Sequence, residues 1–151
     1  MKVGSKEAFK AGSALAGGVA RMGETCGALT GAIMGVCSLV GREKLEDRKQ
    51  YGKAMEEAQK VYNLFREEIG QTLCEEIHQT RYGKVYHLAN PEEREAFHRD
   101  GGPSRTGCPE VCGVAARIAG EVILDLPKKA SKKKPGKTSA RKPKRKTKTR
   151  R

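Results

Sequence analysis

The 151-residue chain contains no tryptophan, and aromatic residues make up only 5% of it. No apolar run approaches the roughly 18–20 residues that a membrane-spanning helix needs. Nowhere do apolar and polar residues alternate with period two for long enough to build a sheet. The sequence therefore predicts neither a membrane span nor a β-rich fold.

Several motifs that carry chemistry are also missing. There is no CxxCH for covalent haem attachment and no HExxH, and the cysteine spacings are too irregular for a zinc ribbon. The glycine-rich stretch AGGVARMGET precedes a helix start and could cradle a phosphate. It follows a predicted helix rather than a strand and lacks GxGxxG or Walker spacing, which argues against a nucleotide site.

The N-terminal segment does not fit a secretory signal. Its apolar residues are interrupted by Glu7, Gly12, Ser13 and the pair at 17–18. We therefore expect a cytoplasmic, reducing setting. Five cysteines in such a setting are more often reactive or metal-binding than paired in structural disulfides.

Charge divides the chain into two parts. Residues 128–151 carry 14 of the 31 Lys and Arg residues and no acid, whereas all 18 acids fall in residues 1–127. The tail lacks aromatic residues and has almost no apolar ones, so we expect it to be disordered and to contact nucleic acid or anionic surfaces weakly. The sequence predicts two parts, a near-neutral body at 1–127 and a basic tail at 128–151.

Apolar periodicity predicts an all-α body. We expect helices at about 6–16, 25–40 and 43–69, one from 72, and one from 109 to 126. A long loop at 80–107 would hold one helical turn near 92–97. The fold class is a small helical bundle of four to five helices.

Three of the five cysteines fall at predicted helix starts. Cys26 follows a Thr25 cap, Cys74 follows Thr72, which has the capping-box spacing to Glu75, and Cys108 is itself the cap before Pro109. Free N–H groups at helix starts favour anions and lower the pKa of thiols. Because the thiolate is the form that binds metals and attacks disulfides, this placement indicates redox or metal chemistry.

Glycines form a strip beside the first of these cysteines. Gly27, Gly31 and Gly35 recur every four residues along one helix, and each costs roughly 1 kcal/mol relative to alanine. Such a strip lets a helix or a cofactor approach the backbone. Tight helix packing alone is the other explanation.

Together these residues resemble a known family. The stretch CGALTG at 26–31, preceded by GGVARMGET and followed by Cys74 in TLCEEI and Cys108 in CPEV, is similar to redox-active proteins named for their C_GCAxxG_C_C pattern. The similarity spans residues 8–126. It implies redox activity, and some relatives in that family, including split-Soret cytochromes, are associated with iron–sulfur or haem cofactors.

The chain departs from the family pattern at one position. The pattern begins with another cysteine upstream, and this chain has none before Cys26. Cys112 lies one helical turn after Cys108 and could replace the missing upstream cysteine. Cys37 lies about 16 Å along the helix from Cys26 and is assigned to packing. A site shared between subunits of a homo-oligomer is another way to complete the set.

Two redox mechanisms remain open. Thiolates of Cys26, Cys74, Cys108 and Cys112 could hold an iron–sulfur cluster or another metal, with metal binding slightly favoured. Alternatively, Cys26 could exchange disulfides with Cys74 or Cys108 as catalytic thiols, and with an unknown redox partner protein.

Other residues add less to the prediction. Gly27, Gly31 and Arg21 are the further candidates for contacting a cofactor or stabilising a thiolate beside Cys26. His78 is four residues after Cys74 but is expected on the helix surface, and His87 and His98 are expected in solvent. The hypothesis from a different class is a nucleic-acid-associated protein whose helical body only presents the tail.

Overall fold

The computed structural model describes residues 5–127. In this range the chain forms six α-helices, one short 3₁₀ helix and no strand. The predicted all-α bundle is confirmed, with six helices instead of four or five. The expected basic tail at 128–151 lies outside the described residues, so its character stays a prediction.

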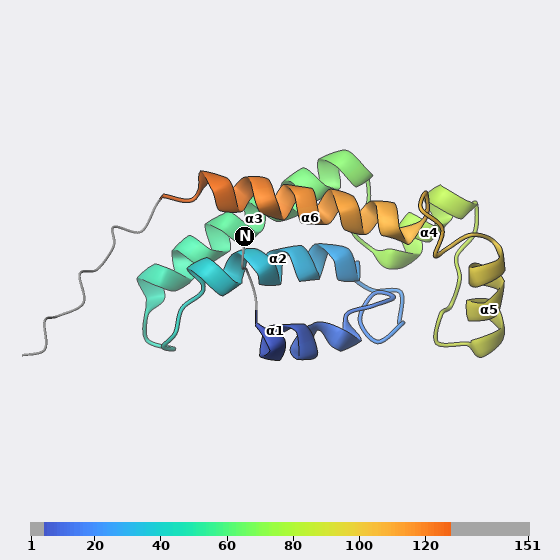
Figure 1. Ribbon diagram of the computed structural model, residues 1–151, viewed down its shortest axis with the longest axis horizontal. Coiled ribbons are helices and arrows are strands. Elements are labelled where there is room, and N and C mark those ends of the chain that lie inside the picture. The colour runs from blue at the N-terminus through green and yellow to red at the C-terminus, as the bar shows by residue number, and fades with distance from the viewer. Residues whose placement is uncertain (1–4, 128–151) are drawn as a thin grey trace, which may run out of the picture.

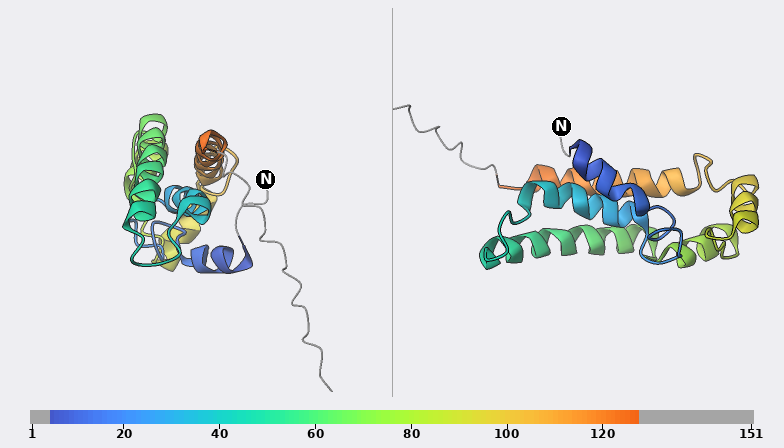
Figure 2. Two further views of the ribbon diagram at one scale, coloured as in Figure 1. Left: turned by 90° about the vertical axis from the view of Figure 1, so that its left-hand side faces the viewer. Right: turned by 90° about the horizontal axis from the view of Figure 1, so that it is seen from below.

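Three helices form the bundle. Helix α2 (Gly27–Val40) contacts both α3 (Arg48–Ile69) and α6 (Cys108–Asp125), and α3 also contacts α6. The end-on view shows α3 and α6 as two columns with α2 between them (Figure 2). Apolar side chains on the facing sides make one core, including Leu29, Val36, Val61, Phe65 and Ile118. Burial of each such side chain stabilises the fold by about 1.5–3 kcal/mol.

The boundaries of α3 follow from its end residues. The Asp47 side chain accepts a hydrogen bond from the backbone N–H of Gln50, which caps the start of the helix. Gly70 ends it in the left-handed conformation, with φ of 86°. The predicted amphipathic helix is therefore confirmed, including its end, and begins at residue 48 instead of 43.

Two short helices close one end of the bundle (Figure 1). Helix α4 (Cys74–Tyr82) is followed by α5 (Pro91–Arg99), whose Asn90 side chain caps the first turn. The expectation of a single helical turn near 92–97 is wrong, because the Asn90 cap and Pro91 in the first turn start a full helix. Tyr82, Tyr86 and Phe97 form a second apolar cluster there.

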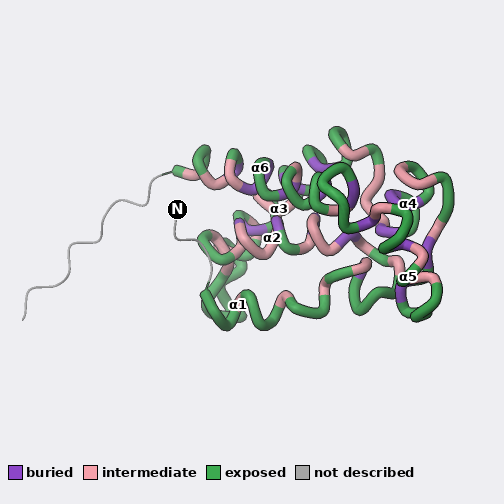
Figure 3. Tube along the Cα trace, turned by 45° about the vertical axis from the view of Figure 1, so that its right-hand side comes forward, coloured by how far each residue is buried: buried purple, intermediate pink, exposed green. Residues whose placement is uncertain are grey.

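Helix α1 (Lys6–Ala11) and the 3₁₀ helix η1 (Gly12–Ala14) lie outside the three-helix bundle. The helix predicted at 6–16 is therefore shorter than expected, and its last turn is the 3₁₀ helix η1. Neither segment contains a buried residue, and Figure 3 shows α1 as exposed or half-buried throughout. Phe9, the largest apolar side chain of α1, is 83% exposed. The apolar side of α1 is therefore poorly packed.

None of the helices in residues 5–127 has both the length and the apolar character that crossing a membrane requires.

Candidate redox site

A left-handed turn leads into the site. Residues 17–21 all have positive φ, between 54° and 69°, and Val19, Ala20 and Arg21 are not glycines. Left-handed backbone costs a non-glycine residue about 1–2 kcal/mol. Hydrogen bonds hold the turn closed, among them the N–H of Gly23 to the Gly17 carbonyl and that of Glu24 to the Gly18 carbonyl, both 3.1 Å. Such strain persists only where the surrounding structure imposes it.

A short backbone bridge then brings two cysteines together. Thr25 pairs with Leu73 in an isolated antiparallel bridge. The Cys26 N–H donates to the Thr72 carbonyl, and the Cys74 N–H donates to the Glu24 carbonyl, each at 2.8 Å. These bonds bring Cys26, just before α2, close to Cys74, the first residue of α4.

Gly18 makes this approach possible. It has φ of 69°, and a Cβ at this position would lie 2.7 Å from the Cβ of Cys74 and closer still to the Glu24 backbone. Any side chain would collide with atoms that cannot easily move. The glycine pair before the cysteine is therefore needed for the geometry of the site.

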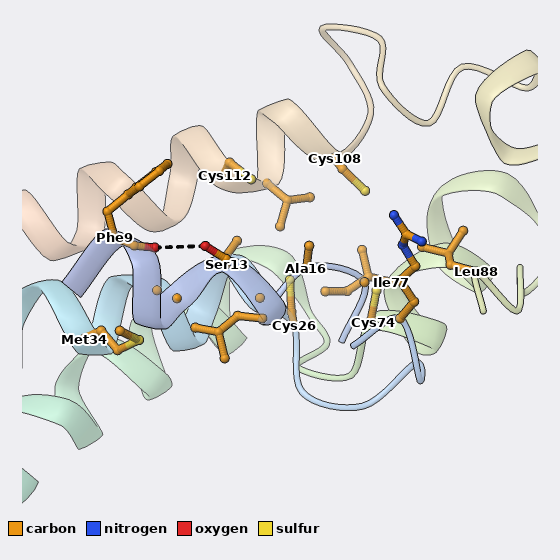
Figure 4. Close-up of a pocket in the computed structure, with 18 of the residues that line it drawn as sticks. Phe9, Ser13, Ala16, Cys26, Met34, Cys74, Ile77, Leu88, Cys108 and Cys112 are labelled. Atoms are coloured by element: carbon orange, nitrogen blue, oxygen red, sulfur yellow. Dashed lines mark hydrogen bonds between the residues drawn. The ribbon is translucent and has the colours of Figure 1, made fainter. Parts of the chain in front are cut away.

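Four thiols from three parts of the chain line one cavity. Cys26 and Cys74 lie on one side of it, and Cys108 and Cys112 reach it from α6 (Figure 4). The four thiols therefore share one space, and the hydrogen bonds between residues 24–26 and 72–74 hold Cys26 beside Cys74. Cys37 is half-buried and does not line the cavity.

Burial makes these thiols hard to ionise. Desolvation, with smaller contributions from Cys26, Cys108 and Glu75, raises the pKa of Cys74 to about 12. Desolvation also raises the thiol pKa of Cys108 and of Cys112, and for Cys108 the nearby Tyr82 hydroxyl opposes the shift. The expected lowering of the pKa by helix starts is therefore wrong for Cys74 and Cys108.

The reason lies in where the backbone N–H groups point. The N–H groups of Cys74 and Glu75 donate to the carbonyls of Glu24 and Gly23, and that of Cys108 donates to Gly102. They are therefore not free to stabilise a thiolate. The predicted threonine caps are also wrong, because Cys26 and Leu73 occupy the cap positions without side-chain bonds. The Thr72 hydroxyl lies 3.3 Å from the Tyr62 hydroxyl instead.

His78 belongs to the site, and its predicted position on the helix surface is wrong. It is 1% exposed, and its Nε2 lies 3.7 Å from the Cys74 sulfur. Its ring packs against Tyr82, Tyr86 and Phe97, and burial lowers its pKa. The His78 Nδ1 atom is buried and has no hydrogen-bond partner of standard geometry among residues 5–127. The Tyr86 backbone acts on the ring in the opposite direction to burial and partly offsets the lowering of its pKa. His78 is thus a neutral imidazole beside a protonated thiol.

Comparison with known protein families gives a match. A family described as "Putative redox-active protein (C_GCAxxG_C_C)" matches residues 1–122. The chain belongs to the C_GCAxxG_C_C family. No match was found among curated proteins or among solved structures.

The glycines of the C_GCAxxG_C_C motif have two different environments. Gly27 lies directly against the Leu15 carbonyl, so its bare backbone allows the chain before the left-handed turn to pack on α2. Gly31 and Gly35 have no atom within 4 Å of where a Cβ would lie. Of the expected close contacts, only the one at Gly27 is made by the protein itself.

The cavity of this family member lies between α1 and the surface of α2 and α6. Its volume is about 1100 Å³, and Gly31, Gly35 and Arg21 contribute to its wall together with the four thiols. His87 and His98 are exposed, as predicted, and His98 borders the cavity. The thiols and the glycine strip therefore belong to one site.

The arrangement of the thiols bears on whether they could hold a metal cofactor. Within residues 5–127, no group of three or more His, Cys, Asp or Glu side chains is arranged to hold a metal ion. Four thiolates suit zinc or an iron–sulfur cluster by their chemistry. In this geometry, however, the thiols share a cavity without converging on one centre.

Proposed function

We propose that the protein is a dithiol–disulfide redox protein whose central thiol is Cys26. The observation that carries the proposal is that Cys26 lines one cavity together with Cys74, Cys108 and Cys112, which come from other parts of the chain. Membership of a redox-active family supports a redox role in general.

The proposed reaction is a two-electron oxidation. The sulfurs of Cys26 and one neighbour form an S–S bond, their two S–H bonds break, and two electrons and two protons pass to the oxidant. When the oxidant is a disulfide, its S–S bond breaks and it leaves as two thiols. In the cytoplasmic, reducing setting that the composition suggests, such a disulfide would be transient.

His78 gives the Cys74 proton a destination. The thiolate is the reactive form, and a thiol with a pKa of about 12 does not form it unaided at neutral pH. Because its own pKa is lowered, the His78 imidazole at 3.7 Å does not hold this proton in the resting protein, but it can accept the proton as the S–S bond forms and pass it on to the oxidant. Cys74 and His78 therefore act as a pair beside Cys26.

The experiment is to equilibrate the protein in dithiothreitol buffers of graded potential and map the disulfides by mass spectrometry. We expect one intramolecular disulfide that contains Cys26. The Cys26→Ser variant should lose it, whereas Cys37→Ser, a change on α2 outside the cavity, should keep it. A disulfide that persists in Cys26→Ser would refute the central role of Cys26.

A metal ion or iron–sulfur cluster bound by Cys26, Cys74, Cys108 and Cys112 is the competing proposal. The shared cavity favours it, but the sulfurs would have to move to a common centre. Metal analysis of protein purified without oxygen distinguishes the two, since the disulfide proposal expects less than stoichiometric metal and no colour.

A further inference from the structure

The cavity beside the thiols is too large to be a packing defect. It is a pocket partly open to solvent, and its volume of about 1100 Å³ is that of a site for an organic ligand. Its apolar wall includes Leu15, Met34, Ile77 and Leu88. Helix α1 borders it without burying any residue, and Phe9 at its wall stays 83% exposed. An apolar occupant would bury these surfaces.

The thiols restrict what this occupant can be. Cys26 and Cys74 are only 9% and 7% exposed, so the disulfide of a partner protein cannot easily line up with their sulfurs. A small molecule in the cavity lies directly against them. The occupant that suits this position is therefore an oxidant small enough to enter.

The residues that line the cavity restrict the class of oxidant further. An oxidant that carries a nucleotide needs a phosphate cradle, and the glycine-rich stretch has neither GxGxxG nor Walker spacing. A quinone needs only an apolar wall and hydrogen-bond donors for its carbonyl oxygens. Arg21 and Arg94 line the cavity and supply hydrogen-bond donors. The Nη1 of Arg94 already donates to the Leu88 carbonyl at 2.9 Å, and its other N–H groups are the donors offered to the ligand.

We propose that the cavity binds an apolar quinone, which oxidises the thiols of the site. The binding of an apolar molecule is argued from the cavity, whereas its identity as an oxidant and the electron transfer rest on the proposed dithiol function. Two S–H bonds break and one S–S bond forms between Cys26 and its partner. Two electrons and two protons pass to the quinone, whose two carbonyl oxygens become the hydroxyls of a hydroquinone.

The glycine strip offers a direct way to fill the cavity. Gly31 and Gly35 border it with open space where a Cβ would lie, so a leucine there projects from α2 without a backbone clash. Leucine also favours a helix more than glycine does, which protects the fold. Gly52 on α3 has equally open space and does not line the cavity, so Gly52→Leu is the matched control.

The probe is decylubiquinone, whose ring carbons all carry substituents, so that thiols cannot add to the ring. We expect the reduced full-length protein to bind one molecule per chain in anaerobic equilibrium dialysis and to lose two free thiols. Gly31→Leu and Gly35→Leu should weaken binding at least about tenfold, while Gly52→Leu should bind like the parent protein. Disulfide formation in dithiothreitol buffers should be unchanged in Gly52→Leu.

Three results would overturn the proposal. One is binding that is equally strong in Gly31→Leu, Gly35→Leu and Gly52→Leu, as expected for non-specific partitioning. The second is no binding, together with a dimer in sedimentation that dissociates in Gly35→Leu, which would assign the cavity to a second copy of the chain. The third is specific binding without thiol loss. If the quinone binds specifically and the thiols stay reduced in dithiothreitol buffers as well, the proposed dithiol function is refuted, whereas the proposed binding site is retained.

Discussion

The Gly18→Ala substitution tests whether the left-handed turn holds Cys74 in place. At this position a Cβ would meet the backbone of Glu24 and lie 2.7 Å from the Cys74 Cβ, and the residue has φ of 69°. The variant therefore combines a backbone penalty with a steric one. Gly83→Ala is the matched control, because Gly83 has φ of 73° and no atom within 4 Å of a Cβ.

The two penalties can be given separate magnitudes. Left-handed φ costs alanine about 1–2 kcal/mol at either position. Overpacking against backbone atoms adds about 1–3 kcal/mol, and only at Gly18. We therefore expect Gly18→Ala to lower the free energy of unfolding by about 2–5 kcal/mol and Gly83→Ala by about 1–2 kcal/mol. The entropy that alanine removes from the unfolded chain is the same in both and cancels.

Urea denaturation of the reduced proteins measures this difference directly. Disulfide mapping in dithiothreitol buffers then shows whether Cys26 still finds its partner in Gly18→Ala. If Gly18→Ala is no less stable than Gly83→Ala and forms the same disulfide, the turn does not position Cys74, and the structural explanation of the glycine pair is incorrect.

Two further predictions concern protons at Cys74. Its pKa is raised in the folded state, from an ordinary value of 9 to about 12, so its contribution to stability is complete below pH 9 and is lost as pH rises toward 12. The unfolding free energy should fall over this range by up to about 4 kcal/mol, and Cys74→Ala should flatten that fall in urea titrations. The second variant, His78→Gln, should slow alkylation of Cys74 at neutral pH at least about tenfold, whereas the exposed His98→Gln should not. Equal rates in the two histidine variants would remove His78 from the proton pathway.

The bundle could be predicted because its signals are local. Apolar residues at steps of three and four defined α3, and Gly70 marked its end. Helix α5 was missed even though Asn90 and Pro91 are a recognisable helix start. The many polar residues around them suggested a loop, since only Phe97 on this helix is buried. A helix of nine residues with one buried side chain gives little apolar periodicity to detect.

The site was harder to predict, because its chemistry depends on tertiary contacts. The spacing of Cys74, Ile77 and His78 places them on one helix face, and this pattern could have identified His78 as buried. The left-handed turn gave no such signal beyond Gly17 and Gly18, because Val19 avoids that conformation in isolation. The thiol pKa values depend on which carbonyls the helix-start N–H groups meet, and local sequence does not contain this information.

The same contacts that assemble the thiols also suppress their reactivity. The bridge between Thr25 and Leu73 brings Cys26 and Cys74 together, but it uses the N–H groups that would otherwise stabilise a thiolate. Burial then raises the pKa of Cys74 and Cys108. Cys112, on the exposed side of α6, supplies a fourth thiol although the upstream family cysteine is missing. We therefore expect Cys26 and Cys74 to react slowly with disulfides in bulk solvent and faster with oxidants that enter the cavity, because their sulfurs are buried and can be reached only from there.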